Sequence, residues 1–333
     1  MLTKTQSKLL PFLEEYEKVG EILCPYMMRT PTPNYASELL STDGAGFRHT
    51  RVGDLNLSPL ETKKLEKGSK VNIFLGSSSL FGIGSSENKF TIPSYLSNLG
   101  LNNPINYGIP AFNSTQELIA YLIYRPKDVE IERIIIFSGI NNFTLKEIGK
   151  VALPNMNPLF NNDIITFNIN RDKSFKLLTK TLIKKILAKV NIDQYSLSQV
   201  QNDKNTKKFN PINQTINDLQ TINLISKGTR SKLYFFFQPL ASLLGKELSS
   251  EEKRILDSLK SLNITTEFLN KKIISQYNKS IKLLEEYCKH ESINYFNLNN
   301  ELKINTKDWF FSDSIHLTDL GYKICSEFIA SVL

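Results

Sequence analysis

The chain has 333 residues, of which 41% are hydrophobic and 10% aromatic, so it can bury a substantial core in one large α/β domain or a domain with an appendage. Its formal net charge is +8, but the basic residues are scattered and form no block of the kind that follows a nucleic-acid backbone, which argues against nucleic acid as a partner. No run of about 18 apolar residues occurs, so we expect no membrane-spanning helix.

The cysteines and the first ten residues indicate the cellular compartment in which the protein is expected. The three cysteines, Cys24, Cys288 and Cys325, are odd in number and match no metal-binding spacing. We interpret them as reduced thiols that pack as small apolar side chains. Residues 1–10 lack the continuous apolar core of a signal peptide. Together these features predict a cytoplasmic location.

Residues 1–70 have a mixed pattern, and we treat them as an N-terminal extension of a main domain over 71–333. A short helix is expected over residues 9–19. Pro25, Pro31 and Pro33 then break the chain into extended or turn segments.

The next part of the chain alternates strands with helices. Three short apolar segments, bounded by glycines or polar residues, predict buried strands: residues 71–75, 104–107 and 133–137. A helix is expected over 92–99, and a second helix begins at the capping box Ser114-Thr-Gln-Glu117 and ends before Pro126. The strands lack period-two alternation, which predicts a parallel sheet covered on both faces.

Residues 143–230 interrupt this rhythm and are interpreted as an insertion. An amphipathic helix is expected over 174–190, and the polar stretch 199–214 predicts a mobile loop. Two interpretations stay open: the insertion forms a cap over the site, or it is a surface loop with no role in function.

The alternation resumes after the insertion. Strands are expected over 232–237 and 293–296, and helices over 247–262, 265–290 and 318–333. Five strands are therefore expected in all. In open parallel sheets the ligand site lies at the carboxyl ends of the strands. The segments that follow the first three strands, Gly76–Ser79, Gly108 and Gly139–Asn142, should therefore lie along one edge of the sheet.

Two distant segments supply the residue types of nucleophilic acyl transfer. A serine cluster, Ser77-Ser78-Ser79, follows the first strand, and Asp313-x-x-His316 precedes the last helix. A histidine takes the proton of an attacking serine, while an aspartate fixes the histidine tautomer and stabilises the imidazolium. Of the three histidines, only His316 has a carboxylate of this kind nearby in sequence; the serine cluster on its own is weak evidence, because such turns are common.

In their joint order these motifs resemble the SGNH hydrolases, also called GDSL esterases and lipases. The matching blocks are Gly76-Ser77-Ser78 with Gly82, then Gly108, then Gly139-x-Asn141-Asn142, and finally Asp313-x-x-His316. The resemblance covers roughly residues 71–142 and 232–333. It implies a three-layer α/β/α, flavodoxin-like fold with a mainly parallel five-stranded sheet.

The resemblance also implies a role for each matched residue. Ser78 would be the nucleophile, His316 the base and Asp313 its partner, and the oxyanion hole would consist of the Ser78 N–H, the Gly108 N–H and the Asn141 side chain. Two positions depart from the family pattern, because Ser77 and Asn142 stand where the family usually has aspartates. They leave the register open, so that Ser77 or Ser79 is an alternative nucleophile, although the spacing from Gly76 to Gly82 favours Ser78.

We therefore expect a serine ester hydrolase that removes an acyl group, with O-acetyl as the expected group, from a carbohydrate or another small ester. No metal or organic cofactor is needed for this chemistry. The Gly-Ser-Ser variant of the first block, with Asn106-Tyr-Gly-x-Pro-x-Phe-Asn-Ser-Thr-Gln-Glu117 downstream, is similar to members linked to bacterial surface polysaccharide synthesis. Two alternatives remain: an O-acyltransferase that moves an acetyl group onto a polysaccharide sugar, and a non-catalytic sugar-binding protein on a degenerate hydrolase fold. The oligomeric state is not predicted.

Overall fold

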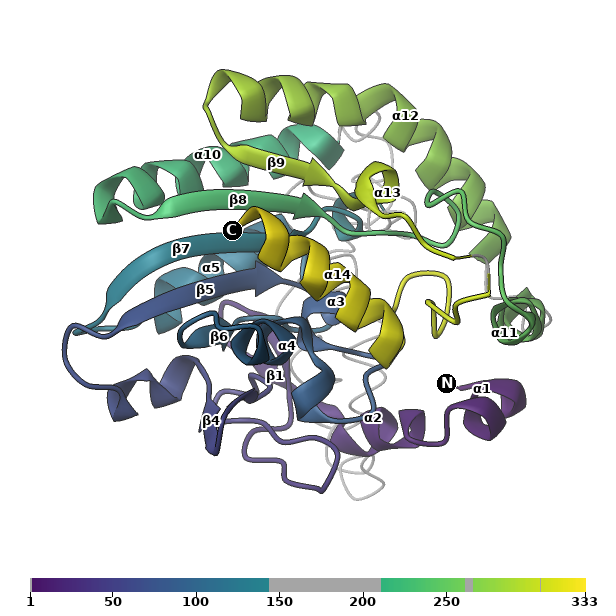
Figure 1. Ribbon diagram of the computed structural model, residues 1–333, viewed down its shortest axis with the longest axis horizontal. Coiled ribbons are helices and arrows are strands. Elements are labelled where there is room, and N and C mark those ends of the chain that lie inside the picture. The colour runs from purple at the N-terminus through teal and green to yellow at the C-terminus, as the bar shows by residue number, and fades with distance from the viewer. Residues whose placement is uncertain (1, 144–210, 261–265, 306) are drawn as a thin grey trace, which may run out of the picture. The chain divides into compact units, whose positions relative to one another are not determined.

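The computed structural model describes residues 2–143, 211–260, 266–305 and 307–333 (Figure 1). The chain divides into two compact units, residues 1–142 with 212–333 and residues 143–211, and the first of these contains the central sheet. The helix expected over 174–190 lies outside the described residues. Where the polar loop was predicted to extend to residue 214, the chain is already helical, since α10 spans Pro211–Thr229.

Five parallel strands form the central sheet. They are β5 (Lys70–Gly76), β6 (Pro104–Asn106), β7 (Glu130–Ser138), β8 (Lys232–Phe237) and β9 (Asn294–Asn297). Their order across the sheet is β6-β5-β7-β8-β9, with all neighbours parallel. Counted along the chain this is the 2-1-3-4-5 order of flavodoxin-like folds. The predicted fold class is therefore confirmed.

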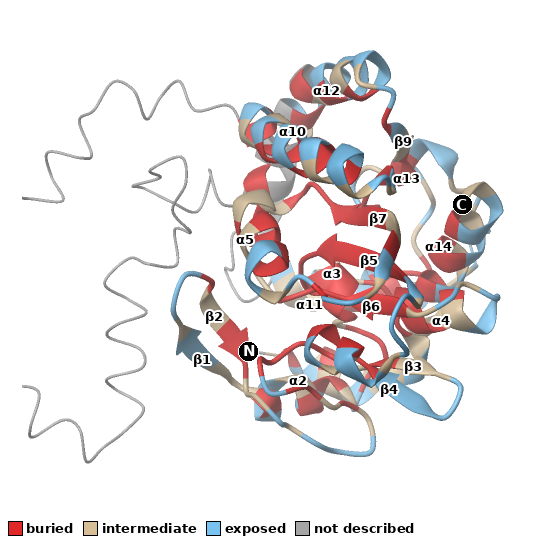
Figure 2. Ribbon diagram, turned by 90° about the vertical axis from the view of Figure 1, so that its left-hand side faces the viewer, coloured by how far each residue is buried: buried red, intermediate tan, exposed pale blue. Residues whose placement is uncertain are grey.

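Helices cover both faces of the sheet (Figures 1 and 2). On one face lie α4 (Ile92–Asn98) and α14 (Asp319–Val332), and on the other lie α5 (Ser114–Tyr124) and α10. The helix α14 begins as expected, with Thr318 as its N-cap. The cap of α5 is one residue earlier than expected: Asn113 accepts from the Gln116 N–H, and the Gln116 side chain closes the box.

The remaining elements of this unit are shorter or peripheral. They are α3 (Ser78–Phe81), η2 (Asn88–Phe90), α11 (Ser250–Lys260), α12 (Thr266–His290) and α13 (Leu298–Glu301). None of the helices that the structure describes combines the length and the apolar character needed to cross a lipid bilayer.

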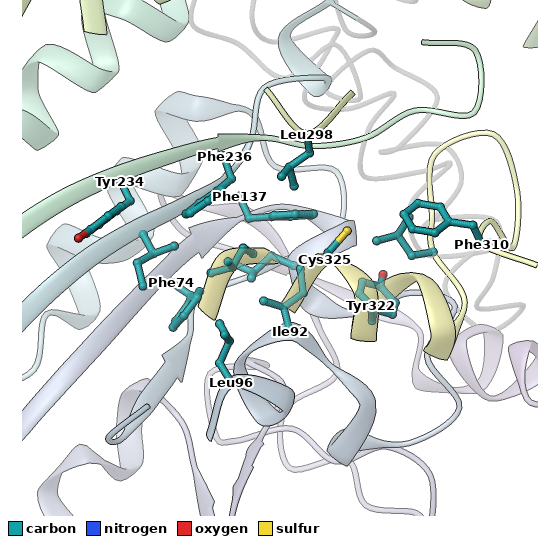
Figure 3. Close-up of a cluster of buried hydrophobic side chains, with 14 of the residues drawn as sticks. Phe74, Ile92, Leu96, Phe137, Tyr234, Phe236, Leu298, Phe310, Tyr322 and Cys325 are labelled. Carbon is teal, nitrogen blue, oxygen red and sulfur yellow. The ribbon is translucent and has the colours of Figure 1, made fainter. Parts of the chain in front are cut away.

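The core lies between the sheet and the α4–α14 layer (Figure 3). Phe74, Phe137 and Phe236 project from three adjacent strands, and all three are 0% exposed. They pack against residues of α4 and α14, among them Ile92 and Tyr322. Burying each such side chain stabilises the fold by roughly 1.5–3 kcal/mol, so this layer fixes the sheet on which the strand-end loops stand.

The N-terminal extension packs against the sheet domain. It contains α1 (Lys4–Leu9), α2 (Leu13–Val19), the strand pairs β1 (Glu21–Cys24) with β2 (Met28–Pro31) and β3 (Thr50–Val52) with β4 (Leu55–Leu57), and η1 (Pro59–Lys64). The single helix expected over 9–19 begins only at Leu13, because Pro11 cannot donate the backbone hydrogen bond of a helix interior. Leu10 and Leu13 share a small core with Ile255 of α11, which joins the extension to the C-terminal half.

Candidate active site

The segment Gly76–Gly82, which we call the serine turn, connects β5 to the one-turn helix α3. Gly76 has to be a glycine, because a Cβ there would lie 2.4 Å from the Phe137 carbonyl oxygen. Ser77 occupies the N-cap position of α3 without a side-chain capping hydrogen bond, and Gly82 ends the helix in the left-handed region at φ 92°. This places Ser78 in the first turn of α3, just beyond the carboxyl end of β5. In this topology ligands bind at that edge of the sheet, where the strand order reverses between β5 and β7.

Ser78, His316 and Asp313 form a continuous hydrogen-bonded chain. The Ser78 Oγ lies 2.8 Å from His316 Nε2, although the two residues are 238 positions apart in sequence. The His316 Nδ1 lies 2.6 Å from Asp313 Oδ2. Because an ionised carboxylate only accepts hydrogen bonds, Nδ1 carries the imidazole proton and Nε2 accepts from the Ser78 hydroxyl. This is the arrangement in which a histidine acts as base toward a serine.

The loop that carries the acid and the base is held by its own backbone. The Asp313 Oδ1 accepts from the N–H groups of Ile315 and His316, each at 2.7 Å. Burial raises the pKa of Asp313, but the adjacent His316 and these hydrogen bonds outweigh burial and leave the pKa below its usual value. Asp313 is therefore ionised near neutral pH, as a group that orients an imidazole has to be.

The neighbouring serines make other contacts. The Ser79 Oγ accepts from the Gln238 side-chain amide at 3.1 Å, and the Ser77 carbonyl accepts from the Phe81 N–H at 2.8 Å. Within the described residues neither Ser77 nor Ser79 forms a hydrogen bond with His316, whereas Ser78 does. The geometry therefore favours Ser78 as the nucleophile among the three serines. Gln238 follows β8, and sequence reasoning did not single it out because a lone glutamine after a strand has no distinctive pattern.

The other two histidines lie elsewhere in the structure. The His49 Nδ1 lies 2.9 Å from Ser41 Oγ, and the exposed His290 contacts Glu291 at the end of α12. In the part of the chain that the structure describes, no group of three or more His, Cys, Asp and Glu residues is placed to hold a metal ion.

The three predicted oxyanion donors differ in whether their hydrogens already bond to an acceptor in the protein. No acceptor is recorded for the Ser78 N–H within the described residues, as is usual for the first turn of a helix. The Asn141 Nδ2 donates one hydrogen to the Phe112 carbonyl oxygen at 2.6 Å, which leaves its second hydrogen for another acceptor. The Gly108 N–H, in contrast, donates to Asn106 Oδ1 at 2.8 Å.

The expectation that the Gly108 N–H would be an oxyanion donor therefore does not hold in this conformation. The reason is an Asx turn, in which the Asn106 side chain takes the N–H two residues further on. Gly108 is required for a different purpose: a Cβ at this position would lie 2.3 Å from the Phe81 backbone nitrogen. The glycine thus allows the loop after β6 to pack directly on α3 of the serine turn.

Asn142, which departs from the family pattern, is held in a polar network. Its Oδ1 accepts from the Ser114 N–H at 3.1 Å, and its Nδ2 donates to Ser114 Oγ at 2.8 Å and to Thr215 Oγ1 at 2.9 Å. The Ser114 hydroxyl in turn donates to Asp218 at 2.5 Å. Asn142 therefore connects the segment after β7 to both helices on that face, and it does so with donors that an aspartate lacks.

Comparison with known proteins gives one kind of match. No family model matches the sequence, and no curated protein matches it. Among solved structures the chain resembles GDSL-like lipolytic proteins. A GDSL-like lipase from Bacteroides thetaiotaomicron is 15% identical, with 82% of this chain and 93% of that chain covered and a TM-score of 0.40. A member of the lipolytic G-D-S-L family from Veillonella parvula is 12% identical, with 80% and 98% covered and a TM-score of 0.39.

An acetyl xylan esterase is also similar in structure, at 9% identity, with 79% of this chain and 99% of that chain covered and a TM-score of 0.39. Such distant similarity does not identify a reaction or a substrate for this chain. The residues at the carboxyl edge of the sheet are what indicate the chemistry of this chain.

Proposed function

We propose that this chain is a serine ester hydrolase of the SGNH type, with Ser78 as nucleophile, His316 as general base and acid, and Asp313 as the partner of His316. The observation that carries the proposal is the hydrogen-bonded chain from Ser78 Oγ through the imidazole to Asp313 Oδ2. A non-catalytic scaffold has no need to keep an ionised aspartate, an oriented imidazole and a serine hydroxyl in this register.

The reaction has two halves. The Ser78 Oγ attacks the ester carbonyl carbon while its proton passes to His316 Nε2, and the carbonyl oxygen becomes an oxyanion. The C–O bond to the alcohol then breaks, and His316 gives its proton to the departing alkoxide. In the second half His316 takes a proton from a water molecule, which attacks the acyl carbon of the acyl-serine. The C–O bond to Ser78 Oγ then breaks, His316 returns the proton to Oγ, and the carboxylic acid leaves.

We assign the stabilisation of the oxyanion to two donors. The Ser78 N–H and the second amide hydrogen of Asn141 follow the carboxyl ends of β5 and β7, which are neighbours in the sheet. Removal of one such donor typically costs about 10²–10³ in kcat. We leave the Gly108 N–H out of this set because Asn106 occupies it.

As substrate we propose an acylated carbohydrate, with O-acetyl as the acyl group. Support comes from the similarity of the serine-containing first block to SGNH proteins linked to surface polysaccharide synthesis. An acetyl group also suits a nucleophile with limited access, because Ser78 is only 8% exposed.

The test is turnover of an aryl acetate and of acetylated oligosaccharides, with acetate measured directly. Ser78→Ala is expected to abolish turnover while the protein stays folded, whereas Ser77→Ala and Ser79→Ala retain it within a fewfold. Adding unacetylated saccharides and weighing the products shows whether water or a sugar hydroxyl takes the acyl group. Unchanged turnover in folded Ser78→Ala would refute the proposal.

A further inference from the structure

Arg48, in the N-terminal extension, occupies an unusual position for an arginine. Its side chain is 0% exposed. All the hydrogen-bond partners recorded for it within the described residues are neutral: Asn88, Tyr16 and the carbonyls of Phe81 and Gly82. Its Nη2 has no recorded partner. Fully buried arginines are rare unless paired with an acid, because removing a charge from water is costly. Burial raises the pKa of the Asp319 carboxyl and the charge of Arg48 acts to lower it, but no hydrogen bond or ion pair joins the two side chains in the described residues. The direct contacts of the guanidinium are therefore to neutral groups, and these contacts indicate a local role.

The guanidinium contacts the last residues of the serine turn. The Arg48 Nη1 donates to the Gly82 carbonyl oxygen at 2.8 Å and lies 3.3 Å from that of Phe81. It also donates to the Tyr16 hydroxyl at 2.8 Å, and this hydroxyl lies 2.6 Å from the Gly82 carbonyl oxygen. The Tyr16 hydroxyl lies equally close, at 2.6 Å, to the Ser85 carbonyl oxygen, and the Gly82 carbonyl also accepts from the Ser85 hydroxyl at 2.8 Å. Arg48 thus places its positive charge at the carbonyls of the C-terminal end of α3, where a cation is favourable, and Tyr16 braces the guanidinium there.

The other side of the guanidinium is fixed as well. The Arg48 Nε donates to Asn88 Oδ1 at 2.8 Å, and the Asn88 amide donates to Ser41 Oγ at 2.8 Å. The side chain is therefore held at both ends by groups outside α3. Arg48 thus connects the serine turn to Tyr16 and Asn88, and through Asn88 to Ser41.

From this geometry we infer that Arg48 is a positioning residue for the nucleophile, an inference that rests on the proposed function. The helix α3 has only four residues, about 6 Å of length, and so short a helix is not stable by itself. A tilt of about 10° about its C-terminal end would move Ser78 by about 1 Å, a displacement that costs on the order of a hundredfold in rate. Arg48 and Tyr16 prevent that tilt from the end opposite to Ser78.

The experiment compares Arg48→Met and Arg48→Lys with the matched control Arg51→Met. Arg51 is three positions further on, its side chain is 42% exposed, and its ion pair with Asp54 is at the surface. Three quantities are measured for each folded variant: kcat and KM for an aryl acetate, the rate of fluorophosphonate labelling of Ser78, and the pH midpoint of kcat/KM.

In Arg48→Met we expect kcat and the labelling rate to fall together by about 10- to 100-fold, with KM and the pH midpoint unchanged, since neither His316 nor Asp313 is touched. Arg48→Lys is expected to recover part of the rate, because an ammonium still donates to a carbonyl but cannot also reach Asn88. The Arg51 variant should match the wild type. A purely structural role would lower the folded fraction and leave the rate per folded molecule intact.

Tyr16→Phe makes the test independent of whether Arg48→Met folds. It removes one hydroxyl and leaves the guanidinium in place, so a smaller loss in kcat, about threefold to tenfold, is expected. Wild-type kcat and labelling rates in folded Arg48→Lys and Tyr16→Phe, or a loss confined to KM, would overturn the inference. Failure of the proposed function itself is distinguishable, because the wild type would then show neither turnover nor labelling of Ser78.

Discussion

Glu117 offers a quantitative test of the structure away from the proposed chemistry. It lies on α5, is 2% exposed, and accepts a hydrogen bond from Ser138 Oγ at 2.5 Å, at the end of β7. Burial raises the pKa of Glu117 to about 8, against the hydrogen bond from Ser138, which lowers it, and with a further increase from the charge of Asp218. The perturbation is Glu117→Gln, which keeps an acceptor for Ser138 and removes the ionisation.

The magnitude follows from proton linkage. The folded-state pKa is raised above the unfolded value of about 4.5, so the stabilising contribution of protonated Glu117 is fully present below that pH and is lost as pH rises through about 8. At pH 7 the Glu117 carboxyl is ionised in the unfolded state and protonated in the folded state. This pH lies about 2.5 units above the unfolded pKa of about 4.5. At about 1.4 kcal/mol per unit, the proton uptake costs the wild type about 3 kcal/mol of stability.

The assay is urea unfolding followed by circular dichroism at pH 5, 7 and 9. The stability of Glu117→Gln relative to the wild type should rise by about 2–3 kcal/mol between pH 5 and pH 7 and level off above pH 8. Glu286→Gln, on an exposed position of α12, is the control and should show no such trend. A difference between Glu117→Gln and wild type that is independent of pH would refute the burial argument for this carboxyl.

Three further substitutions test the site. Gly108→Ala should displace the serine turn and lower kcat by about 10- to 100-fold, whereas Gly228→Ala, whose Cβ would meet nothing within 4 Å, should keep full activity. Asn142→Asp should lower the unfolding free energy by about 1–3 kcal/mol at pH 7, because it loses two donated hydrogen bonds, and by less at pH 4, where the carboxyl regains a proton. Asp313→Asn should lower kcat by on the order of 10⁴ with little change in KM. Steady-state kinetics and urea unfolding check these outcomes.

The sheet was predictable because its strands are nearly continuous apolar segments. Such segments occur where both faces of a parallel sheet are covered, so their pattern marks the strand and its class at once. The start of α5 was missed by one residue because Asn113 and Ser114 are both good N-caps, each followed three residues later by a side chain able to close the box. The pattern of the strands alone does not give their order across the sheet, since pairing is not local; the flavodoxin-like order was expected only from the family resemblance.

In the candidate site, too, features encoded by a local motif were predictable, whereas contacts between distant segments were not. Asp313 and His316 share one local motif, so their approach to each other was expected from spacing alone. The burial of Arg48 was missed because an arginine in an irregular segment has the pattern of a solvent-exposed residue, and its burial depends on partners far away in sequence. The hydrogen bond from the Gly108 N–H to Asn106 was not foreseen, because a glycine after a strand is compatible both with an exposed N–H and with close packing, and only coordinates distinguish them.

The most direct test of the central proposal is labelling with a fluorophosphonate followed by peptide mapping. The proposed chemistry predicts one label per chain, on Ser78, at a rate that falls sharply in His316→Ala because the base is then absent. A label on Ser77 or Ser79, or labelling of Ser78 at the same rate without His316, would contradict the triad. Absence of any label on the folded wild-type protein would contradict the assignment of this chain as a serine hydrolase.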